Sequence, residues 1–245
     1  LKASSRLADN RGVRRKPLIV ALSALVVLTG CGRAGSDVTV SIGSDSHSGP
    51  SDLVTPQSVV LASTDLPGYD VNPAAEPDAA SSQAAAHFQE CAGAGAAALG
   101  GEERSAQSPG FHRGPSTSVS SLATVAADET ESRAAMADLS RPELNRCITH
   151  LLQAVFERDL KVAVTSADSQ ILADGARAPS GGRAVTWRTT LRFTSGGQHE
   201  VAYSDLTFVQ SGRILASLLS FQVGTPYPAA ERRRLMAAMA GRMDA

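Results

Sequence analysis

The fold is decided by residues 185–223, VTWRTTLRFTSGGQHEVAYSDLTFVQSGRILASLLSFQV, where apolar and polar side chains alternate over three successive runs. In the first run Trp187 and Leu191 share one face, while Arg188 and Arg192 lie on the other. A period of two is typical of β-strands that are buried on one face. The linking segments SGG and SG are short and contain glycine, as hairpin turns do. The sequence therefore predicts an antiparallel meander with strands over residues 185–193, 199–209 and 214–223.

The middle run has an irregular alternation. Its apolar face shifts between Tyr203 and Leu206, which predicts a β-bulge at Ser204 and Asp205. A hydrolase site made of His199 and this Ser–Asp pair is disfavoured, because adjacent residues on a strand point to opposite faces. We therefore expect Asp205 to belong to a solvated polar face of the sheet.

Further elements precede the meander. Alternating patterns predict strands over residues 117–125 and 161–171. Ser140 and Glu143 have the spacing of a capping box, which predicts that an amphipathic helix begins at Ser140. An alanine-rich helix over residues 128–139 is expected just before it.

A last helix is expected after Pro228. Its apolar residues recur at helical spacing: Leu235, Met236, Met239 and Met243. Because a helix of about 15 residues is only marginally stable alone in water, this stripe should cover the sheet. The order of elements predicts an α+β fold, an antiparallel β-sheet meander packed against helices on one face or both.

The start of the chain has the pattern of an export signal. The basic stretch 11–16, which contains an Arg pair compatible with twin-arginine export, precedes the uncharged apolar run 18–28. That run is too short to span a hydrocarbon core of about 30 Å. It ends in LTGC, residues 28–31, which resembles the lipobox of bacterial lipoproteins. We expect residues 1–30 to be a signal peptide and Cys31 to be lipidated, with a secreted protein carrying an incidental cysteine as the alternative.

A tether is expected to join this anchor to a single domain. Residues 31–54 are rich in Ser, Gly and Asp, which predicts a flexible segment with a reach of about 25 Å. Thr55 and Pro56 suit an N-cap and a first helical position, so the extracytoplasmic domain should cover residues 55–245. Residues 1–30 hold six basic side chains and one acidic one, so their removal shifts the formal net charge from -1 to -6. Such a chain offers no overall basicity for nucleic acid, and acyl chains must hold it on the cell membrane.

Two cysteines remain after Cys31. Cys91 and Cys147 suffice for one disulfide in an oxidising compartment, which the chain-entropy model values at about 4 kcal/mol for a loop of this length. The alternative is a zinc site, because His87 lies one helical turn before Cys91 and His150 lies close after Cys147. Free or mispaired thiols are a further alternative, and the disulfide is favoured because exported thiols tend to pair.

The chain resembles actinobacterial envelope lipoproteins and extracytoplasmic sensor domains in several features taken together. These are the lipobox, the Ser-rich tether, the segment Leu66-Pro67-Gly68-Tyr69, the cysteine pair, the Gly212–Arg213 hairpin and the Arg-bearing terminal helix. The resemblance covers residues 55–245 and depends mainly on the order of elements. It implies a PsbP/Mog1-like α-β sandwich of the LpqN type. It also implies a non-catalytic binder or accessory factor, with no active-site residues to transfer.

No enzyme motif supports a catalytic function. The chain contains no G-x-S-x-G, P-loop, H-E-x-x-H or Rossmann glycine motif, so we predict a non-enzyme with no cofactor and no resident metal. Its partner would be an envelope lipid, glycan or protein. An extracytoplasmic enzyme with a cryptic site, a lipid or small-molecule carrier, and a structural spacer are the alternatives. An apolar cavity lined by Trp187, Leu191 and Leu218 would favour the carrier.

Two groups of arginines are candidate partner-binding residues. Arg232, Arg233 and Arg234 lie early in the last helix, where the helix dipole disfavours cations. A solvated helix surface, with the arginine stems over apolar neighbours, is the more common reason for such a run. Arg188 and Arg192 would add to an anion-binding patch on the polar face of the sheet. Their alternative is cross-strand pairing with Glu200.

Overall fold

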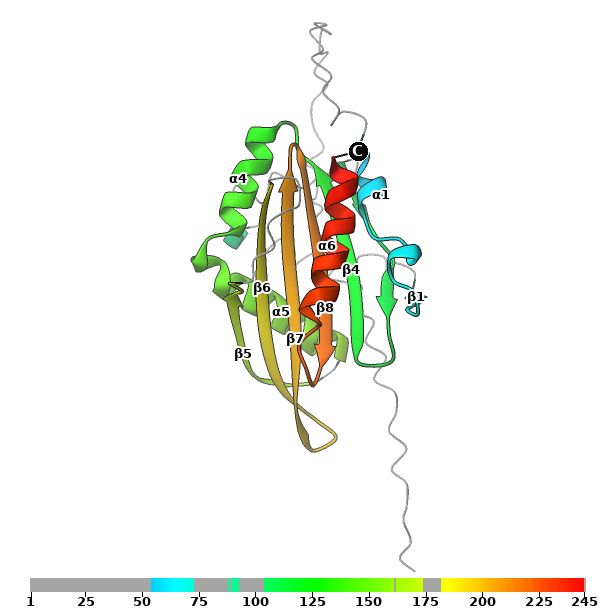
Figure 1. Cartoon of the computed structure of the whole chain (residues 1–245). Helices are drawn as coiled ribbons and strands as arrows, with labels where there is room; N and C mark the ends of the chain where they lie inside the picture. The colour runs from blue at the N-terminus through cyan, green and yellow to red at the C-terminus, as the bar shows by residue number, and fades with distance from the viewer. Residues whose placement is uncertain are drawn as a thin grey trace, which may run out of the picture.

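The computed structural model describes residues 54–72, 88, 90–92, 104–160, 162–173 and 182–244. The expected signal peptide, the lipobox cysteine Cys31 and nearly all of the tether lie outside the described residues. The described residues form one antiparallel sheet with helices on both of its faces, which confirms the α+β class (Figure 1).

The sheet has eight strands in the order β1-β3-β4-β8-β7-β6-β5, with β2 paired to β4. The predicted meander is present, and its strands pair antiparallel throughout. The long strands are β4 (Thr117–Val125), β5 (Val164–Ile171), β6 (Arg183–Ser195), β7 (Gln198–Ser211) and β8 (Ile214–Val223). The short ones are β1 (Asp70–Asn72), β2 (Ser105–Gln107) and β3 (Gly110–His112).

Glycine makes the two tightest hairpins possible. Gly196 and Gly197, with φ of 58° and 79°, lie between the paired ends of β6 and β7. Gly212, with φ of 53°, begins the two-residue connection from β7 to β8. Residues with a Cβ rarely adopt these left-handed conformations, so both turns depend on glycine.

The predicted bulge in β7 is absent. The register runs without interruption through Ser204 and Asp205 on both sides of the strand, whereas a register shift occurs in β5 between Val164 and Ser166. The apparent shift of the apolar face has another cause. Asp205 is a buried charged residue on a regular strand, so polarity in the sequence does not mark the exposed face there.

The helices are α1 (Pro56–Val59), α4 (Glu129–Leu139), α5 (Asn145–Leu160) and α6 (Ala229–Met243), with 3₁₀ turns η3 (Ser63–Asp65) and η5 (Pro142–Leu144). Thr55 and Pro56 hold the expected N-cap and N1 positions of α1. A further helical segment is described only in part, at residues 88 and 90–92.

The predicted capping box at Ser140 is wrong. Ser140 is the C-cap of α4, and its Oγ donates to the carbonyl oxygen of Met136 at 2.7 Å. Pro142 disfavours helical backbone in the residue before it, so Arg141 is extended and the chain resumes in η5 before α5. The helix is therefore present but begins later than the motif indicated.

Two apolar cores lie on opposite faces of the sheet. The first joins α4 and α5 to side chains such as Trp187 and Leu191, and the second joins α1 and α6 to Leu218 and its neighbours. The apolar stripe of α6 is fully used there: Leu235, Met236, Met239 and Met243 are at most 3% exposed. Because Leu218 lies across the sheet from Trp187, these residues do not line one cavity, and that part of the carrier hypothesis is wrong.

Candidate functional site

The face of the sheet that carries α6 is covered unequally. Helix α6 packs on β7 and β8, whereas β5 and β6 run beside it (Figure 1). Residues two apart on a strand, and partners across the register, share a face. We call the uncovered residues of β5, β6 and β7 on this side the open face: Ser166, Asp168, Gln170, Thr190, Arg192, Val201 and Tyr203. All are exposed or half-buried.

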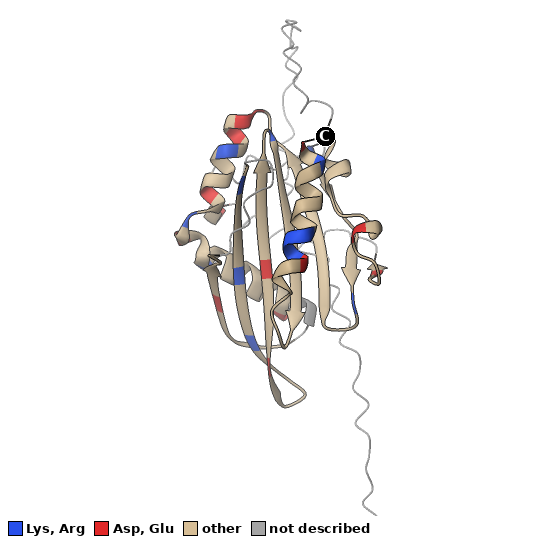
Figure 2. Ribbon diagram, in the orientation of Figure 1, with Lys and Arg blue, Asp and Glu red and all other residues tan. Residues whose placement is uncertain are grey.

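A buried ion cluster borders the open face where it meets α6. Arg188 of β6 contacts Asp205 of β7 through two hydrogen bonds, Nε to Oδ1 at 2.6 Å and Nη2 to Oδ2 at 2.7 Å. Arg232 of α6 donates from Nη1 to the same Oδ2 at 2.5 Å. The Asp205 side chain has no exposed surface, while the side chains of Arg232 and Arg188 are 3% and 18% exposed. Figure 2 shows charged positions on the strands beside the N-terminal half of α6.

This cluster corrects two expectations. Asp205 is not part of a solvated face, and Arg232 is not a surface residue. A buried carboxylate requires close charge partners, and the two guanidiniums supply them. Arg188 and Arg232 therefore have a structural role at Asp205.

The predicted pairing with Glu200 is also wrong. Glu200 lies opposite Phe193, whose side chain belongs to the core beneath α4 and α5, so Glu200 is on the other face of the sheet. Arg192 lies opposite Val201 and Ser166 and is exposed. A shift of one position along a strand changes the face, and that shift separates Arg192 from Glu200.

Arg233 and Arg234 are exposed on different sides of α6. Arg234 acts electrostatically on Asp65, on the side where Arg242 bonds the same carboxylate. At about 100° per residue, Arg233 then lies on the side away from α1, toward the open face. Five arginines were candidate partner-binding residues. Of these, Arg192 is exposed on the open face and Arg233 is exposed beside it on α6.

Two buried polar atoms without hydrogen-bond partners lie on β8 next to this region. Ser220 is the register partner of Asp205, and its Oγ has no partner. Gln222 is the register partner of Tyr203, and its Oε1 is also unsatisfied while its Nε2 donates to Thr225 at 2.9 Å. The polar character of the region therefore extends beneath the first turns of α6.

A second polar cluster fixes α6 on its other side. The hydroxyl groups of Tyr69 and Tyr227 lie 3.0 Å apart, and Tyr69 donates to Oε1 of Glu231 at 3.2 Å. Arg113 lies over the Tyr69 ring, 4.8 Å from its centroid, and contacts Glu231 at 3.5 Å. Burial raises the pKa of both tyrosines, so both hydroxyls stay protonated and can donate. The sequence marks Tyr69 only as part of the Leu-Pro-Gly-Tyr segment, and no local pattern predicts its contact with Tyr227 and Glu231.

The hydrogen bond from Arg242 also secures α6. Its guanidinium donates to Oδ1 of Asp65 at 2.5 Å and to the carbonyl oxygen of Val60 at 3.0 Å. Burial alone would raise the pKa of Asp65, but this hydrogen bond and the Ala62 amide lower it below its usual value. Side-chain contacts therefore hold α6 in place near both of its ends.

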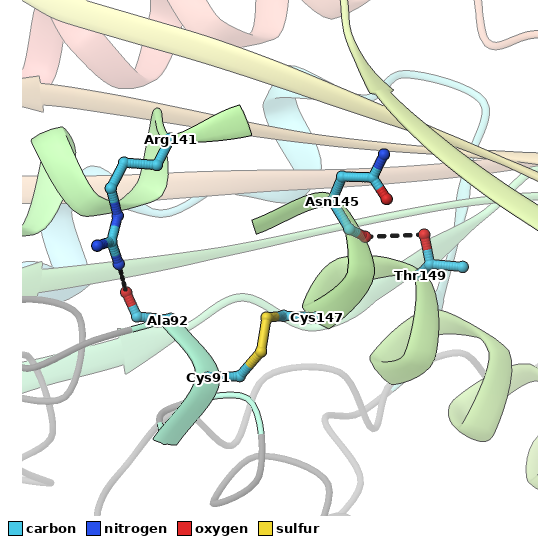
Figure 3. Close-up of a disulfide and its surroundings, with 6 residues drawn as sticks. All are labelled: Cys91, Ala92, Arg141, Asn145, Cys147 and Thr149. Carbon is cyan, nitrogen blue, oxygen red and sulfur yellow. Dashed lines mark hydrogen bonds between the residues drawn. A yellow bond between two sulfur atoms is a disulfide. The ribbon is translucent and has the colours of Figure 1, made fainter. Parts of the chain in front are cut away.

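The predicted disulfide is confirmed. Cys91 and Cys147 are bonded, with Cα atoms 5.9 Å apart, and join the short helix at residues 90–92 to α5 (Figure 3). Arg141 reinforces the contact by donating to the carbonyl oxygen of Ala92 at 2.8 Å. The zinc alternative needed two thiolates, which the sulfur–sulfur bond does not leave. His87 lies outside the described residues.

The ionisable groups at the border of the open face are already paired with one another. The Asp205 carboxylate already accepts from two guanidiniums, so it is not positioned as a general base. Within the described ranges no group of His, Cys, Asp or Glu is arranged to hold a metal ion, and no helix there is long and apolar enough to cross a membrane.

No family model and no curated protein matches this chain.

Proposed function

We propose that this protein is a lipid-anchored envelope protein whose extracytoplasmic domain binds an envelope component without catalysing a reaction. The observation that carries the proposal is the open face. It is a polar, partly aromatic part of a sheet face beside α6, and the Arg188–Asp205–Arg232 cluster fixes its border. A rigid surface with exposed polar groups provides a preorganised binding site.

Other features support the export and the anchoring. A disulfide between Cys91 and Cys147 agrees with an oxidising compartment outside the cytoplasm. The LTGC segment supplies the proposed lipidation site at Cys31, and residues 31–54 supply the tether. An antiparallel sheet between two helical layers also fits the PsbP/Mog1-like sandwich, which remains our proposal for the fold family.

Co-purification from the native envelope tests the function. The full chain would be isolated in mild detergent after cross-linking, and bound lipids, glycans and proteins would be identified by mass spectrometry. We expect at least one component that is enriched with the natural chain and depleted for Arg192→Glu, which alters the exposed arginine of the open face.

Arg133→Glu is the matched control. Arg133 is an exposed arginine on α4, where it pairs with Glu129. Equal recovery of every component with Arg192→Glu and with the natural chain would refute binding through the open face. Turnover of a co-purified component by the protein would refute the non-catalytic part of the proposal.

A further inference from the structure

The open face has the chemistry of a particular class of ligand. This inference rests on the proposed function, because it assumes that the open face is the binding surface. Three properties of the face are relevant: its charge, its mixture of hydrogen-bonding groups and its single aromatic ring.

The charge of the open face and its border is positive. Arg192 is exposed on the face, and Arg233 is exposed beside it on α6. At the border, Arg188 and Arg232 contact the carboxylate of Asp205. Asp168 is the acidic residue among those that define the open face. The surroundings therefore favour an anionic ligand, although the chain as a whole is slightly acidic.

The hydrogen-bonding groups are those that recognise hydroxyl groups. Ser166, Gln170, Thr190 and Tyr203 each offer both a donor and an acceptor, and Asp168 offers acceptors. They lie on three neighbouring strands about 4.8 Å apart, which matches the separation of hydroxyl groups across a sugar ring to within side-chain reach. A simple inorganic anion would need only the arginines.

The aromatic ring adds a flat contact. Tyr203 is half-buried in the middle of β7, between Thr190 on β6 and Gln222 on β8. Such a ring packs against the C–H face of a sugar while its hydroxyl forms hydrogen bonds. Apolar side chains are scarce on the open face, where Val201 is the aliphatic one, so a lipid acyl chain would find little surface to cover.

We infer that the open face binds an acidic saccharide, a sugar chain bearing carboxylate or phosphate groups, with its acid group on Arg192 and a sugar ring on Tyr203. Arg192 and the neighbouring Arg233 on α6 attract the acid group, and the polar side chains of β5 and β6 bond the hydroxyl groups. The ligand is bound and released unchanged.

Calorimetric titration of the detergent-purified full chain tests this inference. The probes are a tetramer of galacturonic acid, a phosphorylated maltotetraose, and their uncharged analogues, methyl-esterified tetragalacturonate and maltotetraose. We expect saturable binding of at least one acidic probe, at least about tenfold weaker binding of its neutral analogue, and weaker binding at high salt. The two acidic probes distinguish a carboxylate from a phosphate as the acid group.

Variants locate the binding. Arg192→Gln and Tyr203→Ala should each weaken binding of the acidic probe about tenfold, whereas Arg133→Gln on α4 should not change it. Arg192→Lys should restore part of the affinity. Absence of binding by both acidic probes, or equal binding of acidic and neutral probes, would overturn the inference.

Two further outcomes would also overturn it. One is binding to phosphatidylglycerol vesicles that depends on Arg192 when neither acidic saccharide binds, which would indicate a lipid surface. The other is co-purification of a protein alone, lost in Arg192→Glu. In both cases the open face would still be a binding surface, so failure of the saccharide inference is distinguishable from failure of the proposed function.

Discussion

At Asp205 a carboxylate without exposed surface depends on two guanidiniums from different elements. Asp205→Asn would remove the negative charge that Arg188 and Arg232 share at this position. Removing one partner of a buried ion pair typically costs about 3–5 kcal/mol, so we expect a loss of that size in the free energy of unfolding. Urea denaturation followed by circular dichroism measures it.

The exposed Asp168 on β5 provides the control for that substitution. Asp168→Asn should change the free energy of unfolding by no more than about 0.5 kcal/mol. A loss below about 1 kcal/mol for Asp205→Asn would show that the cluster does not stabilise the fold.

His112 on β3 should make the stability depend on pH. Burial lowers its pKa in the folded protein, while Asp70 across the register opposes this shift, and Nε2 is buried without a partner. The unfolded chain, with a pKa of about 6.5, therefore binds the proton at a higher pH than the folded protein does. The stability that this group contributes is complete above the unfolded pKa of about 6.5. It is lost as the pH falls from there through the lower pKa of the folded protein.

Denaturation at pH 7.5 and 5.5 tests this effect. His112→Gln should reduce the loss of unfolding free energy between the two values, and His199→Gln, at an exposed hairpin position, should not. Identical pH dependence in His112→Gln and the natural protein would contradict the assignment.

Single residues show most clearly where the sequence stops predicting the structure. The alternation of polar and apolar residues correctly predicts that Arg188, Arg192 and Asp205 lie on strands. The prediction that their polar face is exposed to solvent is wrong for Asp205. Asp205 is buried because α6, distant in sequence, brings Arg232 over it. That contact depends on tertiary packing, which a local sequence pattern does not contain. The contact between Tyr69 and Tyr227 is not predictable from the sequence for the same reason.

At the scale of elements, α6 should be indispensable for folding. Burial of its four apolar side chains, at about 1.5–3 kcal/mol each, contributes on the order of 6–12 kcal/mol, comparable with the net stability of a domain. A chain that ends at Pro226 should therefore unfold or aggregate, and thermal unfolding of this chain and the full one tests the expectation. Equal midpoints would mean that α6 is dispensable.

A point variant separates folding from expression effects. Met239→Ala removes a fully buried side chain and should cost about 2–5 kcal/mol, while Ala237→Ser, at an exposed position on the same helix, should cost little. Unchanged stability in Met239→Ala would contradict a structural role for the stripe.

The disulfide should be a second large contribution. Replacing Cys91 and Cys147 together by Ser should lower the free energy of unfolding by about 4 kcal/mol, because the bond restricts a long loop in the unfolded chain. Chemical denaturation measures the change. Two alkylatable thiols in protein exported by its native route would refute the bond in the mature protein.

Elements were predictable where the local pattern and the packing agree. The strand β8 has the bounds that its alternation predicted, and the start of α5 does not, because Pro142 and the C-cap of α4 override the Ser140 motif. Helices on both faces became evident only from the two cores, since amphipathic stripes do not specify which face of a sheet they cover.

At the scale of the whole molecule, the anchor has a direct test. Cys31→Ala removes the thiol that would carry diacylglycerol, so the protein should appear in the medium or stay unprocessed. Fractionation and intact-mass analysis of the N-terminus measure this. A processed variant that stays in the membrane, with no lipid mass on the natural protein, would contradict lipidation.

The central claim is that this molecule binds its envelope partner through the open face. Hydroxyl-radical footprinting compares side-chain oxidation in the native envelope with that in the purified full chain. We predict protection of Tyr203 and Val201 on the open face, with no change at Val71, which is 52% exposed on β1 at the other end of the sheet. Protection of Val71 together with unchanged oxidation of Tyr203 and Val201 would contradict the claim.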